Sequence, residues 1–249
     1  MCFELDSLPP IPVVRGAAVS HDDLLLEADD GNRFAAFVAT PERPSVVGVV
    51  ILPDVRGLYR FYEELALRFA EHGYAALAID YFGRTAGVGK RGDDFAYIDH
   101  VAQTTEEGIQ VDVAATVEYL RGAGARAIFT VGFCFGGRNA WLTAAGGHAL
   151  SGAIGFYGRP GERDGVPGPA QRAAELEAPI LALQAGADPN ITVEDNAAFE
   201  RALAAARVEH EVVTYEGAPH SFFDRRHDEF AHASADAWRR VLAFIETYA

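Results

Sequence analysis

Short apolar segments alternate with segments of helical periodicity along most of the chain, and this alternation limits the possible folds more than any other feature. The apolar segments predict strands at Val46–Leu52, Ala75–Ile79, Ala127–Val131, Gly152–Phe156, Pro179–Gln184 and Glu211–Tyr215. The predicted helices are Phe61–His72, Glu106–Leu120, Cys134–Ala145, Val193–Ala206 and most of His227–Tyr248. Strands separated by helices form βαβ crossovers, so the sequence predicts an α/β fold with a mostly parallel sheet covered on both faces.

The amino-terminal region follows a different pattern. Residues 18–40 predict two short strands around a turn at Asp29–Asn32, where Gly31 and Asn32 supply the backbone angles of a hairpin. This hairpin is expected to form an antiparallel edge of the sheet. Because no repeat, low-complexity tract or long linker divides the 249 residues, we predict one domain over residues 1–249.

Charge and hydropathy exclude several classes of partner. The formal net charge is −15, which opposes nonspecific binding to nucleic acid and to anionic membranes. No apolar run approaches the roughly 20 residues that a membrane helix needs. No export signal is recognisable at the start of the sequence, and the two cysteines, Cys2 and Cys134, do not suggest an oxidising compartment. A cytoplasmic protein without nucleic-acid or membrane partners is therefore expected.

A candidate nucleophile follows the strand Ala127–Val131. The segment Gly132–Gly137 has the G-x-S-x-G pattern of a nucleophile elbow with Cys134 at the serine position, between a predicted strand and a predicted helix. The sharp turn raises the nucleophile above the sheet. The N–H of Phe135, at the start of the helix, can then face a developing oxyanion. The helix start and a nearby imidazole would also lower the pKa of the Cys134 thiol.

Two further polar side chains follow later strands. Asp188 comes after Pro179–Gln184, and His220 comes after Glu211–Tyr215. The order Cys134, Asp188, His220 is the nucleophile–acid–base order of α/β-hydrolases. The carboxyl ends of parallel strands lie at one edge of a sheet, so we expect these three side chains to form a catalytic triad there.

These residues resemble the dienelactone hydrolase family, thiol-dependent members of the α/β-hydrolase fold. The resemblance extends from about Val46 to Phe244, and its most specific parts are Gly132–Gly137, the turn at Asp188 and Pro219–Phe222. Leu52–Gly57 and Asp80–Arg84 also look like loops of the family. The resemblance implies hydrolysis of an ester bond in an unsaturated lactone that carries a carboxylate, without a metal or organic cofactor.

The resemblance also implies roles for individual residues. Cys134 attacks the lactone carbonyl, His220 transfers protons, and Asp188 orients His220. The main-chain N–H groups of Val55 and Phe135 form the oxyanion hole.

The sequence departs from the family pattern at two places. Asp54 stands where the family has a glutamate that contacts the resting thiol, and its side chain is one methylene shorter. Arg84 matches one arginine that binds the substrate carboxylate, but Asp224 occupies the place of the second, with Arg225 and Arg226 just beyond. The remaining substrate-binding candidates are Tyr81, Tyr157 and Ser221.

The expected activity is hydrolysis of an activated ester or enol-lactone through a Cys-His-Asp triad and a thioester acyl-enzyme. A thiolate attacks activated carbonyls readily, and an enolate leaving group needs little general-acid help. The partner is a small-molecule ester or lactone, including carboxylate-bearing ones, and the chain is expected as a monomer or small homo-oligomer. Alternatives are a broader carboxylesterase or thioesterase with the same triad, a thiol redox sensor with Cys2 as resolving cysteine, and a non-catalytic ligand-binding relative.

Overall fold

The computed structural model describes residues 3–4, 6–92 and 94–249 and contains one eight-stranded sheet in the order β1-β2-β4-β3-β5-β6-β7-β8. The strands are β1 (Val19–Glu27), β2 (Arg33–Pro41), β3 (Val47–Leu52), β4 (Ala75–Ile79), β5 (Ala127–Phe133), β6 (Gly152–Phe156), β7 (Ile180–Ala185) and β8 (His210–Tyr215). Strand pairs from β4 through β8 are parallel, while β1 pairs antiparallel with β2 and β2 with β4. The predicted parallel sheet with an antiparallel amino-terminal edge is confirmed.

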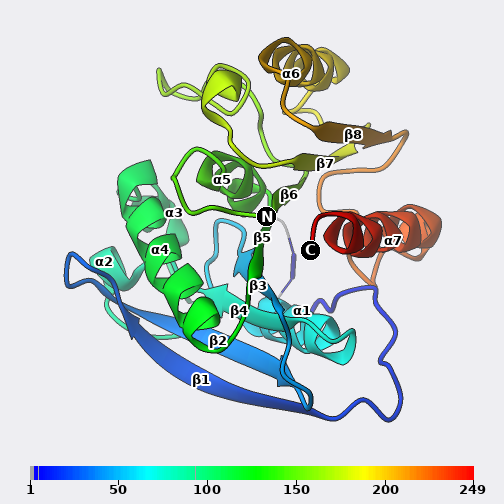
Figure 1. Ribbon diagram of the computed structural model, residues 1–249. Coiled ribbons are helices and arrows are strands. Elements are labelled where there is room, and N and C mark those ends of the chain that lie inside the picture. Colours follow the sequence, from blue (N-terminus) through cyan, green and yellow to red (C-terminus); the bar gives the residue numbers. More distant parts are fainter. Residues whose placement is uncertain (1–2, 5, 93) are drawn as a thin grey trace.

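Helices cover both faces of this sheet. They are α1 (Arg60–Glu71), α2 (Gly83–Ala86), α3 (Tyr97–Val101), α4 (Glu106–Gly122), α5 (Phe135–Thr143), α6 (Val193–Ala206) and α7 (Ala231–Tyr248), with short 3₁₀ turns at Ala173–Glu175 and Asp228–Phe230. Figure 1 shows α1 and α7 on one side of the sheet and α4 and α5 on the other. The sequence did not predict α2 and α3, because helices of four and five residues are too short to show an apolar period.

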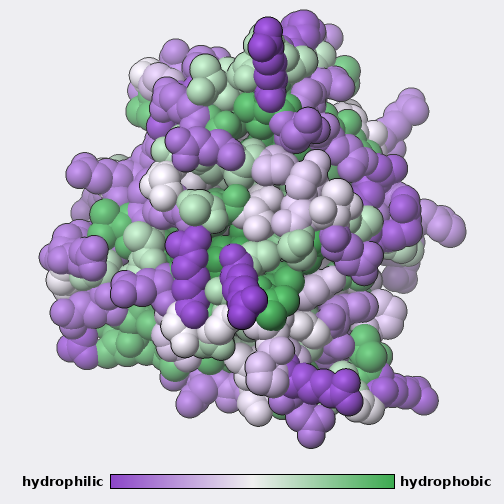
Figure 2. Space-filling model, in the orientation of Figure 1, coloured by the Kyte–Doolittle hydropathy of each residue, from purple (hydrophilic) through white to green (hydrophobic). Residues whose placement is uncertain are grey.

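The central strands are buried on both faces, which explains why they form continuous apolar runs. On β3, Val49 and Ile51 pack into the core cluster under α1 and α7, whereas Val50 and Leu52 pack into the cluster under α4. A third cluster joins α5 and α6 to β6 and β7. Figure 2 shows hydrophilic side chains over most of one face of the molecule, with hydrophobic residues in small patches between them.

Candidate active site

Cys134 lies in a strained turn between β5 and α5. Its backbone has φ 55° and ψ −111°, a left-handed conformation that few non-glycine residues adopt. The Cys134 N–H donates to the carbonyl oxygen of Phe156 at 2.9 Å, which holds the turn against β6. This geometry places the half-buried side chain at the carboxyl end of the sheet, as the nucleophile-elbow pattern predicts.

Two glycines permit this turn because backbone from other segments approaches them closely. A Cβ at Gly132 would lie 2.0 Å from the carbonyl oxygen of Gly136. A Cβ at Gly136 would lie 2.0 Å from the carbonyl oxygen of Leu52 in β3. Any side chain at either position would push α5 away from the strands, so the motif glycines follow from steric contact.

Asp188 and His220 reach Cys134 from the loops after β7 and β8. Nδ1 of His220 donates to Oδ2 of Asp188 at 2.5 Å, and the N–H of Asn190 donates to Oδ1 of Asp188 at 2.8 Å. A hydrogen bond also links His220 to Cys134. The two loops are joined by backbone hydrogen bonds, including Ala187 N–H to Ala218 O at 2.9 Å. The structure thus brings the three predicted triad residues into one continuous chain of contacts.

The charges in this chain of contacts stabilise one another. Burial lowers the pKa of His220, but the hydrogen bonds with Asp188 and Cys134 outweigh it and raise the pKa to about 9. Burial likewise opposes ionisation of Asp188, yet the hydrogen bonds from His220 and Asn190 hold its pKa below the ordinary value. At neutral pH the arrangement therefore favours a charged imidazolium beside a carboxylate.

Asp54 is fully buried in the loop between β3 and α1, close enough to Cys134 for their charges to interact. Burial raises the pKa of Asp54 to about 7, the negative charge of Cys134 adds to the rise, and the N–H of Arg56 and the hydroxyl of Tyr59 oppose it. Those two groups donate to its carboxylate at 2.9 and 3.2 Å. A proton on Asp54 is thus sensitive to the charge on the thiol.

A cavity of about 680 Å³ opens beside Cys134, a volume within the range of small-molecule sites. Cys134, His220, Tyr157, Val55 and Phe135 all border it. Val55 and Phe135, the predicted oxyanion-hole residues, therefore lie at the same space as the predicted nucleophile. The ring of Tyr157 lies 4.9 Å from that of His220 and is fully buried.

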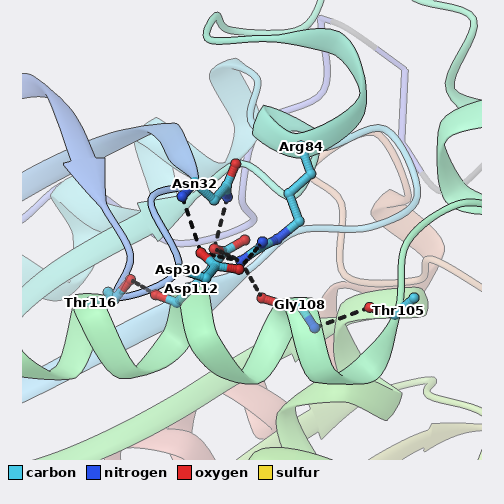
Figure 3. A network of polar contacts seen from close by, with 7 residues as sticks. All are labelled: Asp30, Asn32, Arg84, Thr105, Gly108, Asp112 and Thr116. Carbon is cyan, nitrogen blue, oxygen red and sulfur yellow. Dashed lines mark hydrogen bonds and ion pairs between the residues drawn. The ribbon is translucent and has the colours of Figure 1, made fainter.

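The structure does not bring Arg84 to this cavity. Figure 3 shows Arg84 directed at Asp30 in the β1–β2 turn and at Asp112 in α4. Nη2 of Arg84 donates to Oδ1 of Asp112 at 2.7 Å, and Nδ2 of Asn32 donates to the same atom at 2.9 Å. The guanidinium of Arg84 therefore already binds two carboxylates. It links the β1–β2 turn to α4, whereas the resemblance implied a contact with the substrate.

Three other predicted binding residues also lie outside the residues that border the cavity. Arg225 donates through Nη2 to the carbonyl oxygens of Pro9 and Ile11, and so holds the amino-terminal segment. Tyr81 is buried and its hydroxyl donates to the carbonyl oxygen of Pro53 at 2.9 Å. Ser221 is buried in a left-handed conformation with φ 65°. Its hydroxyl has no hydrogen-bond partner among the described residues.

The cations that do border the cavity are Arg138, Arg159 and Arg163. None of them was singled out from the sequence. Arg138 follows Cys134 by four residues, one turn of helix, so helical spacing could have placed it on the same side of α5 as the nucleophile. Arg159 and Arg163 belong to the Gly/Pro-rich loop after β6, whose path carries no periodic signal.

Among the described residues, no helix is long and apolar enough to span a membrane. Within the same residues, no cluster of three or more His, Cys, Asp or Glu side chains has an arrangement that could hold a metal ion.

Comparison with known proteins places these features in a family. The model of the dienelactone hydrolase family matches residues 34–249. A carboxymethylenebutenolidase of Rhodococcus opacus is 30% identical over 100% of this chain and 97% of its own length. A Yersinia pestis protein that provisionally carries the same name is 30% identical over 85% of this chain and 83% of its own.

Comparison with solved structures leads to the same family. The crystal structure of a provisionally assigned dienelactone hydrolase from Klebsiella pneumoniae superposes with a TM-score of 0.81 and 27% identity, covering 93% of this chain and 100% of that one. The α/β-hydrolase fold expected from the sequence is therefore confirmed.

Proposed function

The chain belongs to the dienelactone hydrolase family and is a hydrolase of esters or lactones, and from this premise we propose that it cleaves activated esters and enol-lactones through Cys134, His220 and Asp188. The observation that carries the proposal is the continuous contact from Asp188 through His220 to Cys134 at the border of the large cavity. A nucleophile, a base and an orienting carboxylate in hydrogen-bond reach are the parts that covalent acyl transfer requires.

The proposed reaction has two halves. Cys134 reacts as a thiolate paired with the His220 imidazolium, and its sulfur forms a bond to the carbonyl carbon. The carbonyl oxygen becomes negative, and the N–H groups of Val55 and Phe135 stabilise it. The bond between carbonyl carbon and ring oxygen then breaks, and the leaving enolate oxygen takes the proton from His220. Water next loses a proton to His220 and attacks the thioester, which breaks the C–S bond and releases a carboxylic acid and the thiolate.

Asp54 has a proposed role in charge balance at the thiol. Its carboxyl is buried, and its pKa of about 7 depends in part on the charge of Cys134. When Cys134 is a thiolate, Asp54 favours the protonated form, and when the sulfur is acylated, Asp54 can ionise. This coupling supports a role near that of the family glutamate despite the shorter side chain.

The cations around the cavity support acceptance of a carboxylate on the substrate. Arg138, Arg159 and Arg163 border it, together with the acids Glu162 and Asp164. In a chain of net charge −15, arginines at the cavity locally favour an anionic group that the rest of the surface repels. Carboxylate-bearing lactones are therefore among the proposed substrates, attracted by the positive charge of these arginines rather than by Arg84 or Arg225.

The test compares a carboxylate-bearing dienelactone with a neutral aryl ester, using wild type, Cys134→Ala and His220→Ala. We expect wild type to consume the lactone, Cys134→Ala to lose that turnover, and His220→Ala to lose roughly 10²–10⁴-fold in kcat. Mass spectrometry of acid-quenched reactions should find the acyl group on Cys134. Full lactone turnover by Cys134→Ala would exclude the proposed nucleophile. Turnover of the aryl ester alone would favour a broader esterase with the same triad.

A redox sensor is the competing class. Its resolving cysteine would be Cys2, which lies outside the described residues. Peroxide titration of wild type and Cys2→Ala separates the two functions, since a sensor would lose its disulfide in the variant whereas a hydrolase would keep full ester turnover.

A further inference from the structure

A second chamber of about 250 Å³ adjoins the catalytic cavity. The two spaces share four lining residues, Phe135, Arg138, Arg163 and Asp164. Because the same side chains border both, the two spaces lie next to each other around Phe135. Neither Cys134 nor His220 borders it, so it lies beyond the reacting groups.

Apolar side chains from four separate elements form part of the walls of the second chamber. Val101 ends α3, Ile109 lies in α4, Leu142 lies in α5, and Val166 belongs to the loop after β6. An aliphatic group of a ligand would make dispersion contacts on several sides there.

The polar groups of these walls already have partners within the protein. Nδ2 of Asn139 donates to the carbonyl oxygen of Phe135 at 2.9 Å, and Glu106 forms an ion pair with Arg172. Beside Asn139 and Glu106, a ligand therefore gains little from polar atoms and more from hydrocarbon.

The loop after β6 roofs the chamber, and Arg138 holds this loop in place. Its guanidinium donates to the carbonyl oxygens of Arg159, Gly161, Val166 and Pro167, the last at 3.0 Å. The backbones of Arg163 and Val166 also bond to each other at 3.0 and 2.9 Å. These hydrogen bonds hold the loop at several points beside the chamber.

The position of the chamber indicates which part of a substrate enters it. The leaving-group oxygen must face His220, which supplies its proton, and His220 borders only the catalytic cavity. Phe135, whose N–H is the proposed donor to the acyl oxygen, borders both spaces, so an arm of the acyl group that extends past Phe135 would reach the chamber.

We propose that this second chamber binds an apolar arm of the acyl group, so that preferred substrates are esters or lactones whose acyl part carries an aliphatic or aromatic extension of several carbons. The inference rests on the proposed function, because it takes Cys134 as the acylated residue and His220 as the proton donor.

The test uses 4-nitrophenyl esters, which share one leaving group, with acyl chains from acetyl to octanoyl. In wild type, kcat/KM should rise about threefold for each methylene until the chamber is full. Ala102→Trp places an indole at an exposed alanine that borders the chamber. It should lower the octanoate-to-acetate ratio of kcat/KM by at least about tenfold.

The matched control is Ala205→Trp, at an exposed alanine near the end of α6 that does not border either space. Its octanoate-to-acetate ratio should equal that of wild type. A flat chain-length profile in wild type, or the same ratio in Ala102→Trp as in wild type, would overturn the inference while leaving ester hydrolysis established.

A second readout does not require turnover. Alkylation of Cys134 by iodoacetamide and by N-hexyl iodoacetamide is followed by mass spectrometry. The hexyl reagent should react faster in wild type, and Ala102→Trp should remove that advantage. If no ester is hydrolysed but the hexyl reagent still reacts faster in wild type alone, the proposed hydrolase function is wrong, whereas binding of an apolar arm in the chamber is supported. Equal rates for both reagents, or no alkylation by either, would count against the chamber.

Discussion

At the scale of single residues, the site contains a titratable side chain that is buried, where burial disfavours its charged form. Asp54 is fully buried, and its carboxylate receives hydrogen bonds from Arg56 N–H and the Tyr59 hydroxyl. Burial dominates over these bonds and raises its pKa from 3.8 to about 7. A carboxyl group whose pKa lies so close to neutral pH can gain or lose its proton when the charge on Cys134 changes. The same pKa shift makes the free energy of unfolding depend on pH.

The sign of that dependence is fixed by the direction of the pKa shift. The folded state keeps the Asp54 proton between about pH 4 and pH 7, where the unfolded chain has lost it, so wild type loses stability as pH rises through this window. Asp54→Asn cannot ionise. Its stability relative to wild type should therefore increase by roughly 2–4 kcal/mol from pH 4 to pH 8 in urea unfolding. Asp29→Asn, at an exposed turn residue, is the control. A pH-independent difference for Asp54→Asn would show that Asp54 ionises normally.

At the scale of elements, Arg84 connects parts of the fold that are distant in sequence. It joins α2 to the β1–β2 turn through Asp30 and to α4 through Asp112 (Figure 3). Asp112 is buried, and burial raises its pKa to about 6 although Asn32 and Arg84 oppose the rise. The arginine therefore compensates a buried carboxylate and fixes the hairpin against the helical layer.

Arg84→Gln should separate this structural role from substrate binding. Without the guanidinium, Asp112 stays buried without a cation, and we expect a loss of about 1–3 kcal/mol in unfolding free energy at pH 8. The loss should be smaller at pH 5, where Asp112 can hold its proton. The kcat/KM for a carboxylate-bearing lactone should stay within about twofold of wild type. A large rise in KM with unchanged stability would instead return Arg84 to the substrate site.

For the whole molecule, one sheet separates two helical layers that each contain a tryptophan. Trp141 in α5 packs against β6 and β7, and Trp238 in α7 packs in the cluster on the opposite face with Phe69. The sheet is common to both clusters, so loss of one layer exposes strand residues on which the other layer depends. This continuity supports the prediction that the chain unfolds as a single domain.

Two single-tryptophan variants test that prediction. Trp141→Phe leaves fluorescence to report on the layer of Trp238, and Trp238→Phe leaves it to report on the layer of Trp141. In each variant the urea midpoint from fluorescence should coincide with the midpoint from circular dichroism. A fluorescence midpoint that differs from the circular dichroism midpoint in either variant would indicate that the two layers unfold separately.

The sequence by itself determined the sheet and the place of the candidate catalytic residues. Continuous apolar runs such as Val46–Leu52 predict strands buried on both faces, and βαβ connections bring the carboxyl ends of such strands to one edge. Cys134, Asp188 and His220 each follow one of these strands, so their positions in the sequence predict that they lie at one edge of the sheet. The turn at Cys134 could also be recognised from the sequence. Close backbone contacts exclude a side chain at Gly132 and at Gly136, and the two glycines therefore appear as a motif on either side of the cysteine.

Only the tertiary structure decided which cations face the cavity. Arg84 matches a family position, but Asp30 and Asp112, 54 and 28 residues away, bind its guanidinium. Arg138 gained its role from carbonyl oxygens 21 to 29 residues later in the chain. A long charged side chain can turn toward any partner within reach, and which partner lies there depends on packing of remote segments. Neither the periodicity of apolar residues nor the spacing of motifs in the sequence indicates which partner such a side chain contacts.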